Sequence, residues 1–232
     1  MKRPAIIVPE GCKEVLLHAC CAPCSSAIVE WLVQHDIRPV IFYYNPNIYP
    51  REEYEIRKNE SKRHAESLGL KWIDGDYDHE QWLEGLMSQR DGSFVTLSAG
   101  DVTKEPSLCD IQRAPERGIR CERCFIYRLT AAAKKAQELG IRYFTTTLAS
   151  SRWKSLEQIE RAGHLAEQIV SRRGQDTLCH NDVTKYPDPG VTFWAQNWRK
   201  GGLYERLNQL LKEFNFYNQQ YCGCEFSQRN KS

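Results

Sequence analysis

Short apolar segments and longer amphipathic segments alternate along the chain. The short ones have the length and the β-branched and aromatic content of strands, and they cover residues 14–19, 39–44, 70–73, 143–148 and 191–195. The longer ones repeat apolar residues at helical spacing, which predicts helices over residues 23–35, 51–68, 125–139, 156–170 and 203–214. Strands that alternate with helices are typical of a parallel sheet flanked by helices. The pattern therefore predicts an α/β fold, with residues 1–232 in a single domain.

Three of the predicted strands end beside residues that can bind ligands. Cys20 and Cys21 follow the first strand, Asn45 and Asn47 follow the second, and further polar residues follow Leu148. Ligands of open α/β sheets bind beyond the carboxyl ends of the strands. We therefore expect these segments to converge on one site, although they are distant in sequence.

Composition and charge narrow the function only slightly. The chain is 41% hydrophobic and 27% charged, as in ordinary globular proteins. No uncharged apolar run reaches the length of about 18 residues that a membrane-spanning helix needs, and the first residues lack the apolar centre of a signal peptide. We expect a soluble, cytoplasmic protein. The net charge is +2, but residues 109–154 hold ten Lys or Arg against four Asp or Glu. Such a basic zone either binds phosphate groups or forms an ordinary solvated face.

Cysteines are the unusual feature of the composition, since there are ten and seven of them are clustered. In a chain of this length without a secretion signal, they indicate metal or redox chemistry rather than a disulfide framework. Cys20, Cys21 and Cys24 lie between a predicted strand and a helix first turn, where free amide groups stabilise thiolates. Cys121 and Cys124 have the C-x-x-C spacing of metal ligands and open the helix predicted near residue 125. Four such thiolates can hold zinc or a [4Fe–4S] cluster, and the residues alone favour neither.

A third cluster, Cys222 and Cys224, lies near the C-terminus. A C-x-C disulfide closes a small, strained ring that is easily reduced, which suits a redox couple. A pair of additional metal ligands is the alternative. We expect the segment 215–232 to fold back over the site, so that this pair lies near the other clusters. The remaining cysteines are isolated and are interpreted as ordinary thiols: Cys12, Cys109 and Cys179.

Two other functions fit part of the pattern. A thioredoxin-like thiol–disulfide oxidoreductase would use Cys21 and Cys24, because a strand, C-x-P-C and a helix follow one another there. That interpretation leaves Cys20 and the two other clusters without a role. A structural zinc protein that binds RNA through its basic segment is the second alternative. A brown, iron-containing preparation would exclude both.

Five motifs together resemble one protein family. They read HACCAPCS, YYNPNIYPREEYEIR, GIRCERCFIYRL, FTTTLASSRWK and NWRKGG with a later YCGCEFS, and they extend from Leu17 to Ser227. Their types and order resemble those of the QueH-type epoxyqueuosine reductases. The resemblance implies an α/β fold of the HUP, Rossmann-like type. It also implies reduction of epoxyqueuosine to queuosine at the wobble position, residue 34, of a tRNA.

The same resemblance implies roles for the clustered cysteines. By motif, the ligands of a [4Fe–4S] cluster would be Cys20, Cys21, Cys121 and Cys124. Cys24 would be the local ligand of an adjacent mononuclear iron. Cys222 and Cys224 would be the redox-active pair. An external electron donor, which the resemblance does not identify, would reduce their disulfide after each turnover.

The substrate that the resemblance implies needs a pocket for a base taken out of the anticodon loop. Asn45 and Asn47 are candidates for hydrogen bonds to that base, and Tyr54, with Tyr43 and Tyr44, for stacking on it. Candidates for phosphate contact are Arg120, Arg123 and Arg128. One departure from the family's pattern is Arg152-Trp153, where family members often carry Ser-Pro, and it leaves the orientation of Lys154 open.

Overall fold

A parallel sheet forms the centre of the molecule. The computed structural model describes residues 6–87, 107–176 and 190–227. The strands of that part of the chain are β1 (Glu14–Ala19), β2 (Arg38–Tyr43), β3 (Trp72–Asp74), β4 (Tyr143–Thr146) and β5 (Thr192–Phe193). They pair in parallel in the order β3-β2-β1-β4-β5. This is the order of a doubly wound, Rossmann-like sheet, so the predicted α/β class is confirmed.

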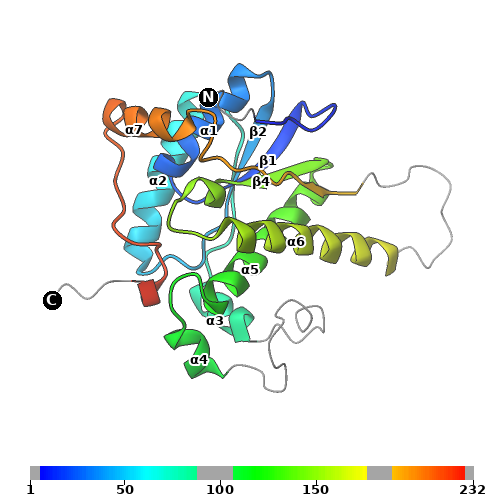
Figure 1. Cartoon of the computed structure of the whole chain (residues 1–232), viewed down its shortest axis with the longest axis vertical. Coiled ribbons are helices and arrows are strands. Elements are labelled where there is room, and N and C mark those ends of the chain that lie inside the picture. The colour runs from blue at the N-terminus through cyan, green and yellow to red at the C-terminus, as the bar shows by residue number, and fades with distance from the viewer. Residues whose placement is uncertain (1–5, 88–106, 177–189, 228–232) are drawn as a thin grey trace.

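Helices cover both faces of the sheet. They are α1 (Ala22–Gln34), α2 (Arg51–Ser67), α3 (His79–Met87), α4 (Leu108–Arg113), α5 (Ile119–Glu138), α6 (Leu156–Asp176) and α7 (Leu203–Glu213). Helix α1 packs against α2 and α7 on one side, while α5 packs against α6 on the other (Figure 1). The predicted stripe of α5 is fully buried at Leu129, Ala132, Ala133 and Ala136. Short apolar side chains there allow the helix to approach the sheet closely.

The start of α5 differs from the sequence prediction. The helix begins at Ile119, not near residue 125, with Gly118 as its N-cap. Cys121 and Cys124 therefore lie within its first turns. Two short helices were not predicted, α3 and α4. The second begins at a capping box in which Ser107 and Asp110 bond each other's backbone amides.

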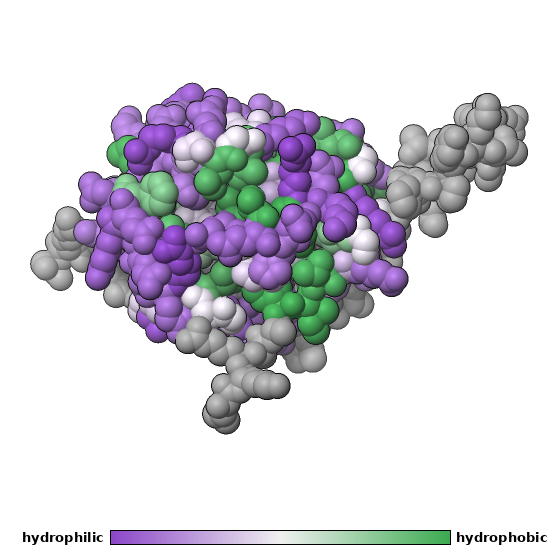
Figure 2. Space-filling model, turned by 90° about the horizontal axis from the view of Figure 1, so that it is seen from above, coloured by the Kyte–Doolittle hydropathy of each residue, from purple (hydrophilic) through white to green (hydrophobic). Residues whose placement is uncertain are grey.

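Apolar side chains gather between the layers, and the outer surface is mainly polar. The face seen from above carries hydrophilic residues with smaller hydrophobic groups between them (Figure 2). Among the described residues, no helix is both long and apolar enough to cross a membrane.

The carboxyl ends of β1, β2 and β4 converge as the sequence predicted. The side-chain amide of Asn45, after β2, donates to the carbonyl oxygen of Ala19 at 2.9 Å. The backbone N–H of Cys20, after β1, donates to the hydroxyl of Thr147 at 3.1 Å. The strand order reverses between β1 and β4, and such a switch point is where doubly wound sheets bind ligands.

Candidate active site

Two adjoining pockets open at this edge of the sheet. The larger has a volume of about 410 Å³ and the smaller about 40 Å³. Cys20, Cys21 and Cys24 line the larger pocket, and Cys222 lines both. The smaller pocket adds three more thiols, from Cys121, Cys124 and Cys224. The other residues shared by the two pockets are Asn47, Glu116, Arg128, Trp153, Lys154 and Ser227. All seven clustered cysteines thus meet at one place, from three distant parts of the chain.

The first three thiols form a compact group where β1 turns into α1. The Sγ atoms of Cys20, Cys21 and Cys24 all lie within 4.8 Å of one another. Cys20 and Cys21 are 3.8 Å apart at sulfur. Thiolates bound to a single zinc ion, at a Zn–S length of about 2.3 Å, lie about 3.8 Å apart in a tetrahedron. The trio therefore has a spacing that a single metal ion can use. Cys24 belongs to this group with its two neighbours.

Proton sharing makes the three thiols inequivalent. Hydrogen bonds from Cys21 and Cys24 hold the pKa of Cys20 well below its usual value. Burial raises the pKa of Cys21, and the hydrogen bond with Cys20 raises the pKa of Cys24. The hydroxyl of Thr147 donates to the sulfur of Cys20 at 3.2 Å, and the amide of Gln219 donates to the sulfur of Cys21 at 2.9 Å. The surroundings thus stabilise negative charge on the sulfur of Cys20, and the thiolate is the form that binds metals.

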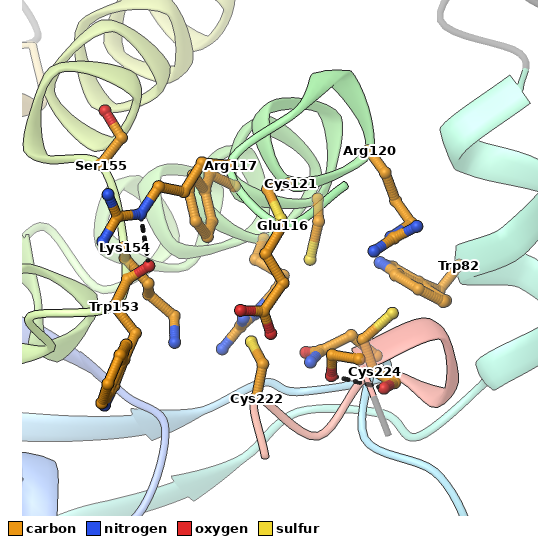
Figure 3. A pocket seen from close by; sticks show the side chains of 15 residues that line it. Trp82, Glu116, Arg117, Arg120, Cys121, Trp153, Lys154, Ser155, Cys222 and Cys224 are labelled. Atoms are coloured by element: carbon orange, nitrogen blue, oxygen red, sulfur yellow. Dashed lines mark hydrogen bonds between the residues drawn. The ribbon is translucent and has the colours of Figure 1, made fainter. Parts of the chain in front are cut away.

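The second group of thiols lies between α5 and the C-terminal segment. Cys121 comes from α5, and Cys222 and Cys224 come from the opposite wall, facing it (Figure 3). Burial raises the pKa of Cys121 to about 11 and that of Cys224 further. Both Cys222 and Cys224 are free thiols in this structure. They can therefore act as a dithiol beside the other cysteines.

A buried ion pair on α2 holds the C-terminal segment in place. Arg57 and Glu53 approach to 2.6 Å, with side chains 3% and 10% exposed. Arg57 also donates to the carbonyl oxygens of Tyr221 and Cys222, each at 3.3 Å. The second oxygen of Glu53 accepts from the hydroxyl of Tyr217 at 2.9 Å. These contacts fix the backbone on which the C-x-C pair sits.

Gly223, between the two thiols, occupies a position where any other residue would be strained. Its φ of +105° lies in the left-handed region, which strains any other residue. A Cβ atom there would lie 2.8 Å from Cγ1 of Ile48 and 3.0 Å from Nη1 of Arg57. The glycine therefore permits both the turn and its close approach to the ion pair.

Lys154 is a cation that lies beside both groups of thiols. Burial alone would lower its pKa, but thiolate charge on Cys222, Cys20 and Cys24 raises the pKa above the ordinary value of a lysine. The side chain lines both pockets. It stays protonated and faces the groups that carry negative charge.

The predicted substrate-binding asparagines have different surroundings. Asn45 is fully buried; its amide nitrogen bonds Ala19 and its oxygen accepts from Arg128. Its hydrogen-bonding groups therefore serve the fold. Asn47 is 1% exposed and lines both pockets, and its Oδ1 has no hydrogen-bond partner in the described part of the chain. Of the two, Asn47 is the one with an acceptor to offer a ligand.

Three other residues predicted to contact substrate have partners within the fold. Tyr54 is 2% exposed and packs 4.2 Å from the ring of Tyr77, in an aromatic cluster outside both pockets. Arg120 is buried and donates to the carbonyl oxygens of Gln112 and Ala114. Arg123 is also buried and donates to a carbonyl oxygen of α3 at 2.6 Å. Arg120 also lines the smaller pocket. These side chains support the fold, and their contact with substrate stays a prediction.

The isolated cysteines lie away from the pockets where the structure describes them. Cys12 is buried with its thiol near the carbonyl oxygen of Glu14, and Cys109 is exposed on α4. Cys179 lies outside the described residues. The sequence did not single out Arg57, because its helix is rich in charged residues that normally face solvent. The i, i+4 spacing from Glu53 was the available signal.

Comparison with known proteins places the chain in a family. The sequence model described as "Epoxyqueuosine reductase QueH" matches residues 15–93 and 105–230. A protein of that name from Histophilus somni is 39% identical over 98% of this chain and 77% of its own length. Another, from Thermotoga maritima, is 32% identical over 92% of this chain and 89% of its own length.

A solved structure, the U34-tRNA thiolase NcsA from Methanococcus maripaludis with its [4Fe-4S] cluster, covers 93% of this chain and 61% of its own. The identity is 10% and the TM-score 0.40, a likeness too small to carry a conclusion about this chain. The family model and the sequence relatives are sufficient by themselves. The chain belongs to the epoxyqueuosine reductase QueH family and is an oxidoreductase.

Proposed function

We propose that this protein reduces epoxyqueuosine to queuosine at the wobble position of a tRNA. Family membership supports the reaction, and the convergence of seven cysteines on two adjoining pockets carries the argument for its chemistry. The larger pocket, about 410 Å³, falls within the range of about 300–1,000 Å³ that small-molecule sites occupy. It can take one modified base that has left the anticodon loop.

The donor set fits an iron–sulfur cofactor. Cys20, Cys21, Cys121 and Cys124 would hold a [4Fe–4S] cluster, with Cys24 left for an adjacent iron, as its place in the compact trio allows. Depressed pKa at Cys20 and the amide donor on Cys21 are features that stabilise thiolate ligands. When bound, such a cluster supplies single-electron transfer next to the substrate.

The Cys222 and Cys224 thiols match the electron requirement of the reaction. Converting an epoxide to an alkene breaks two C–O bonds and takes two electrons and two protons, and the oxygen leaves as water. Oxidation of two thiols to one disulfide releases two electrons and two protons. An external donor of two electrons must then reduce the disulfide for the next turnover.

Lys154 and Asn47 are placed to orient the substrate. Both line the two pockets, beside Cys222. The ammonium group of Lys154 can donate to the epoxide oxygen and stabilise the negative charge that develops as its bonds break. The unpaired Oδ1 of Asn47 can accept a hydrogen bond from the base. Asn45 and Arg128 would act indirectly, by fixing the wall behind them.

One set of preparations tests the proposal. Wild type, Cys121→Ser, Cys222→Ser/Cys224→Ser and Cys109→Ser are purified without oxygen. Iron, sulfide and zinc are measured, followed by conversion of tRNA that carries epoxyqueuosine. We expect Cys121→Ser to lose iron and sulfide, and the exposed-site variant Cys109→Ser to match wild type. The double variant should keep its metal and lose repeated turnover.

Three results would contradict parts of the proposal. Zinc without sulfide in the wild type would favour a structural zinc protein. Loss of half the iron from Cys222→Ser/Cys224→Ser would make that pair a set of ligands. Dependence on Cys21 and Cys24 alone, with the other thiols dispensable, would favour a thioredoxin-like enzyme.

A further inference from the structure

Trp153 is a large apolar side chain exposed at the mouth of the site. It is 71% exposed, although its residue lines both pockets. Its indole lies at the edge of the pocket, beside Lys154 and opposite the α3 side (Figure 3). Leaving so large an aromatic surface in water is unfavourable by itself. Its place at the entrance makes contact with an incoming ligand the simplest use.

Two arginines hold the loop that carries Trp153. Arg117 donates to the carbonyl oxygen of Trp153 at 2.9 Å (Figure 3). It also donates to the carbonyl oxygen of Arg152 at 3.1 Å. Arg199 donates to the carbonyl oxygens of Ser151 and Lys154, the latter at 2.7 Å. The loop is thus fixed from both sides through its backbone. An aromatic ring on such a support is preorganised for stacking, since little freedom remains to be lost on contact.

The surroundings of Trp153 are basic and aromatic. The guanidinium of Arg152 lies 4.3 Å from the ring centroid of Tyr204 and donates to its hydroxyl at 2.5 Å. Arg152, Lys154 and Tyr204 line the larger pocket next to Trp153. Positive charge beside exposed aromatic rings is the combination that binds single-stranded nucleic acid, because phosphates pair with the charge and bases stack on the rings.

We propose that the Trp153 rim, meaning residues 151–155 with Tyr204, docks the single-stranded loop of an RNA. Trp153 stacks on a nucleobase next to the one that enters the pocket, and Arg152 contacts a phosphate. The inference rests on the proposed function for the identity of the pocketed base. A base that leaves its stack exposes the faces of its neighbours, and an aromatic side chain at the entrance covers one of them.

Binding without turnover tests the rim separately from the chemistry. We would measure the dissociation constant of an unmodified anticodon stem–loop RNA at several salt concentrations. Trp153→Ala should weaken binding about 5- to 150-fold, the range for loss of one base–aromatic stack. Trp153→Phe should stay within about threefold of wild type, because a phenyl ring also stacks. Leu139→Ala, an exposed apolar change at the far end of α5, should have no effect.

Salt dependence separates stacking from charge. Trp153→Ala should leave the slope of log affinity against log salt unchanged, whereas Arg152→Gln should reduce it by about one. Equal affinity of Trp153→Ala and wild type would overturn the inference and point to a protein partner at the rim. If wild type converts epoxyqueuosine tRNA while Trp153→Ala binds RNA normally, the docking proposal is wrong and the proposed function stands. If Trp153-dependent binding occurs without conversion, the rim stands and the proposed function fails.

Discussion

Replacing Arg57 by Met tests whether the buried ion pair fixes the redox segment. The substitution keeps most of the side-chain volume. It removes the positive charge and all five N–H donors of the guanidinium group. The side chain of Glu53, only 10% exposed, would then lose its positive partner. It would keep one hydrogen bond, from the hydroxyl of Tyr217. The carbonyl oxygens of Tyr221 and Cys222 would lose their donor as well.

The expected cost follows from burial. Removing one member of a buried pair leaves an uncompensated charge and lowers the free energy of unfolding by about 3–5 kcal/mol. Arg206 provides a matched control, because it approaches Glu30 to the same 2.6 Å with both side chains about one-third exposed. Water screens that pair, so Arg206→Met should cost much less. The double variant Glu53→Gln/Arg57→Met removes the stranded charge and should regain part of the loss.

Urea unfolding followed by circular dichroism measures these differences. The unfolding midpoint of Arg57→Met should fall with an unchanged dependence on denaturant. Alkylation of Cys222 should become faster in the same variant, since its backbone is no longer held. Equal losses for Arg57→Met and Arg206→Met would refute the reasoning, because burial would then make no difference.

Three further predictions follow from the site and the packing around it. Lys154→Met should bind iron as wild type does but lose most turnover, measured by conversion of tRNA; full activity would remove Lys154 from the mechanism. Gly223→Ala should lower the free energy of unfolding by at least roughly 1–2 kcal/mol, the cost of a left-handed residue other than glycine. The added Cβ atom would also contact Ile48, which should displace the two thiols and slow turnover. A crystal structure in which this segment has not moved would contradict the prediction. Burial lowers the pKa of His64 below its ordinary 6.5, so the unfolded chain takes up a proton first and stability falls as pH drops below about 6.5. His64→Gln should therefore lose less stability than wild type between pH 7 and 5.

The pattern of apolar and polar residues was sufficient to predict the sheet. It was not sufficient to predict which charged side chains are buried. The strand predicted at residues 14–19 is observed, and the strand predicted at residues 143–148 ends at Thr146, where a short 3-10 helix begins. Short runs of mostly apolar, aromatic or β-branched residues marked both. The burial of Arg120 and Arg123 was not predicted, because each donates to carbonyl oxygens of another helix, α4 or α3, and residue spacing within one helix does not reveal such contacts. The convergence of Cys20 and Cys21 with the segment after β2 followed from the topology of a parallel sheet. The hydrogen bond from Arg57 to the carbonyl oxygen of Cys222 could not be predicted in this way, because it joins residues 165 positions apart.

The wide separation of the cysteine clusters also sets an order of assembly during synthesis. Cys20 precedes Cys222 by about 200 residues, which at about 5–20 residues per second is a delay of roughly 10–40 s. The trio of Cys20, Cys21 and Cys24 therefore emerges long before the segment that covers it. During that interval its thiols are open both to metal loading and to oxidation. The first cluster therefore spends part of synthesis without the shielding that the C-terminal segment later provides.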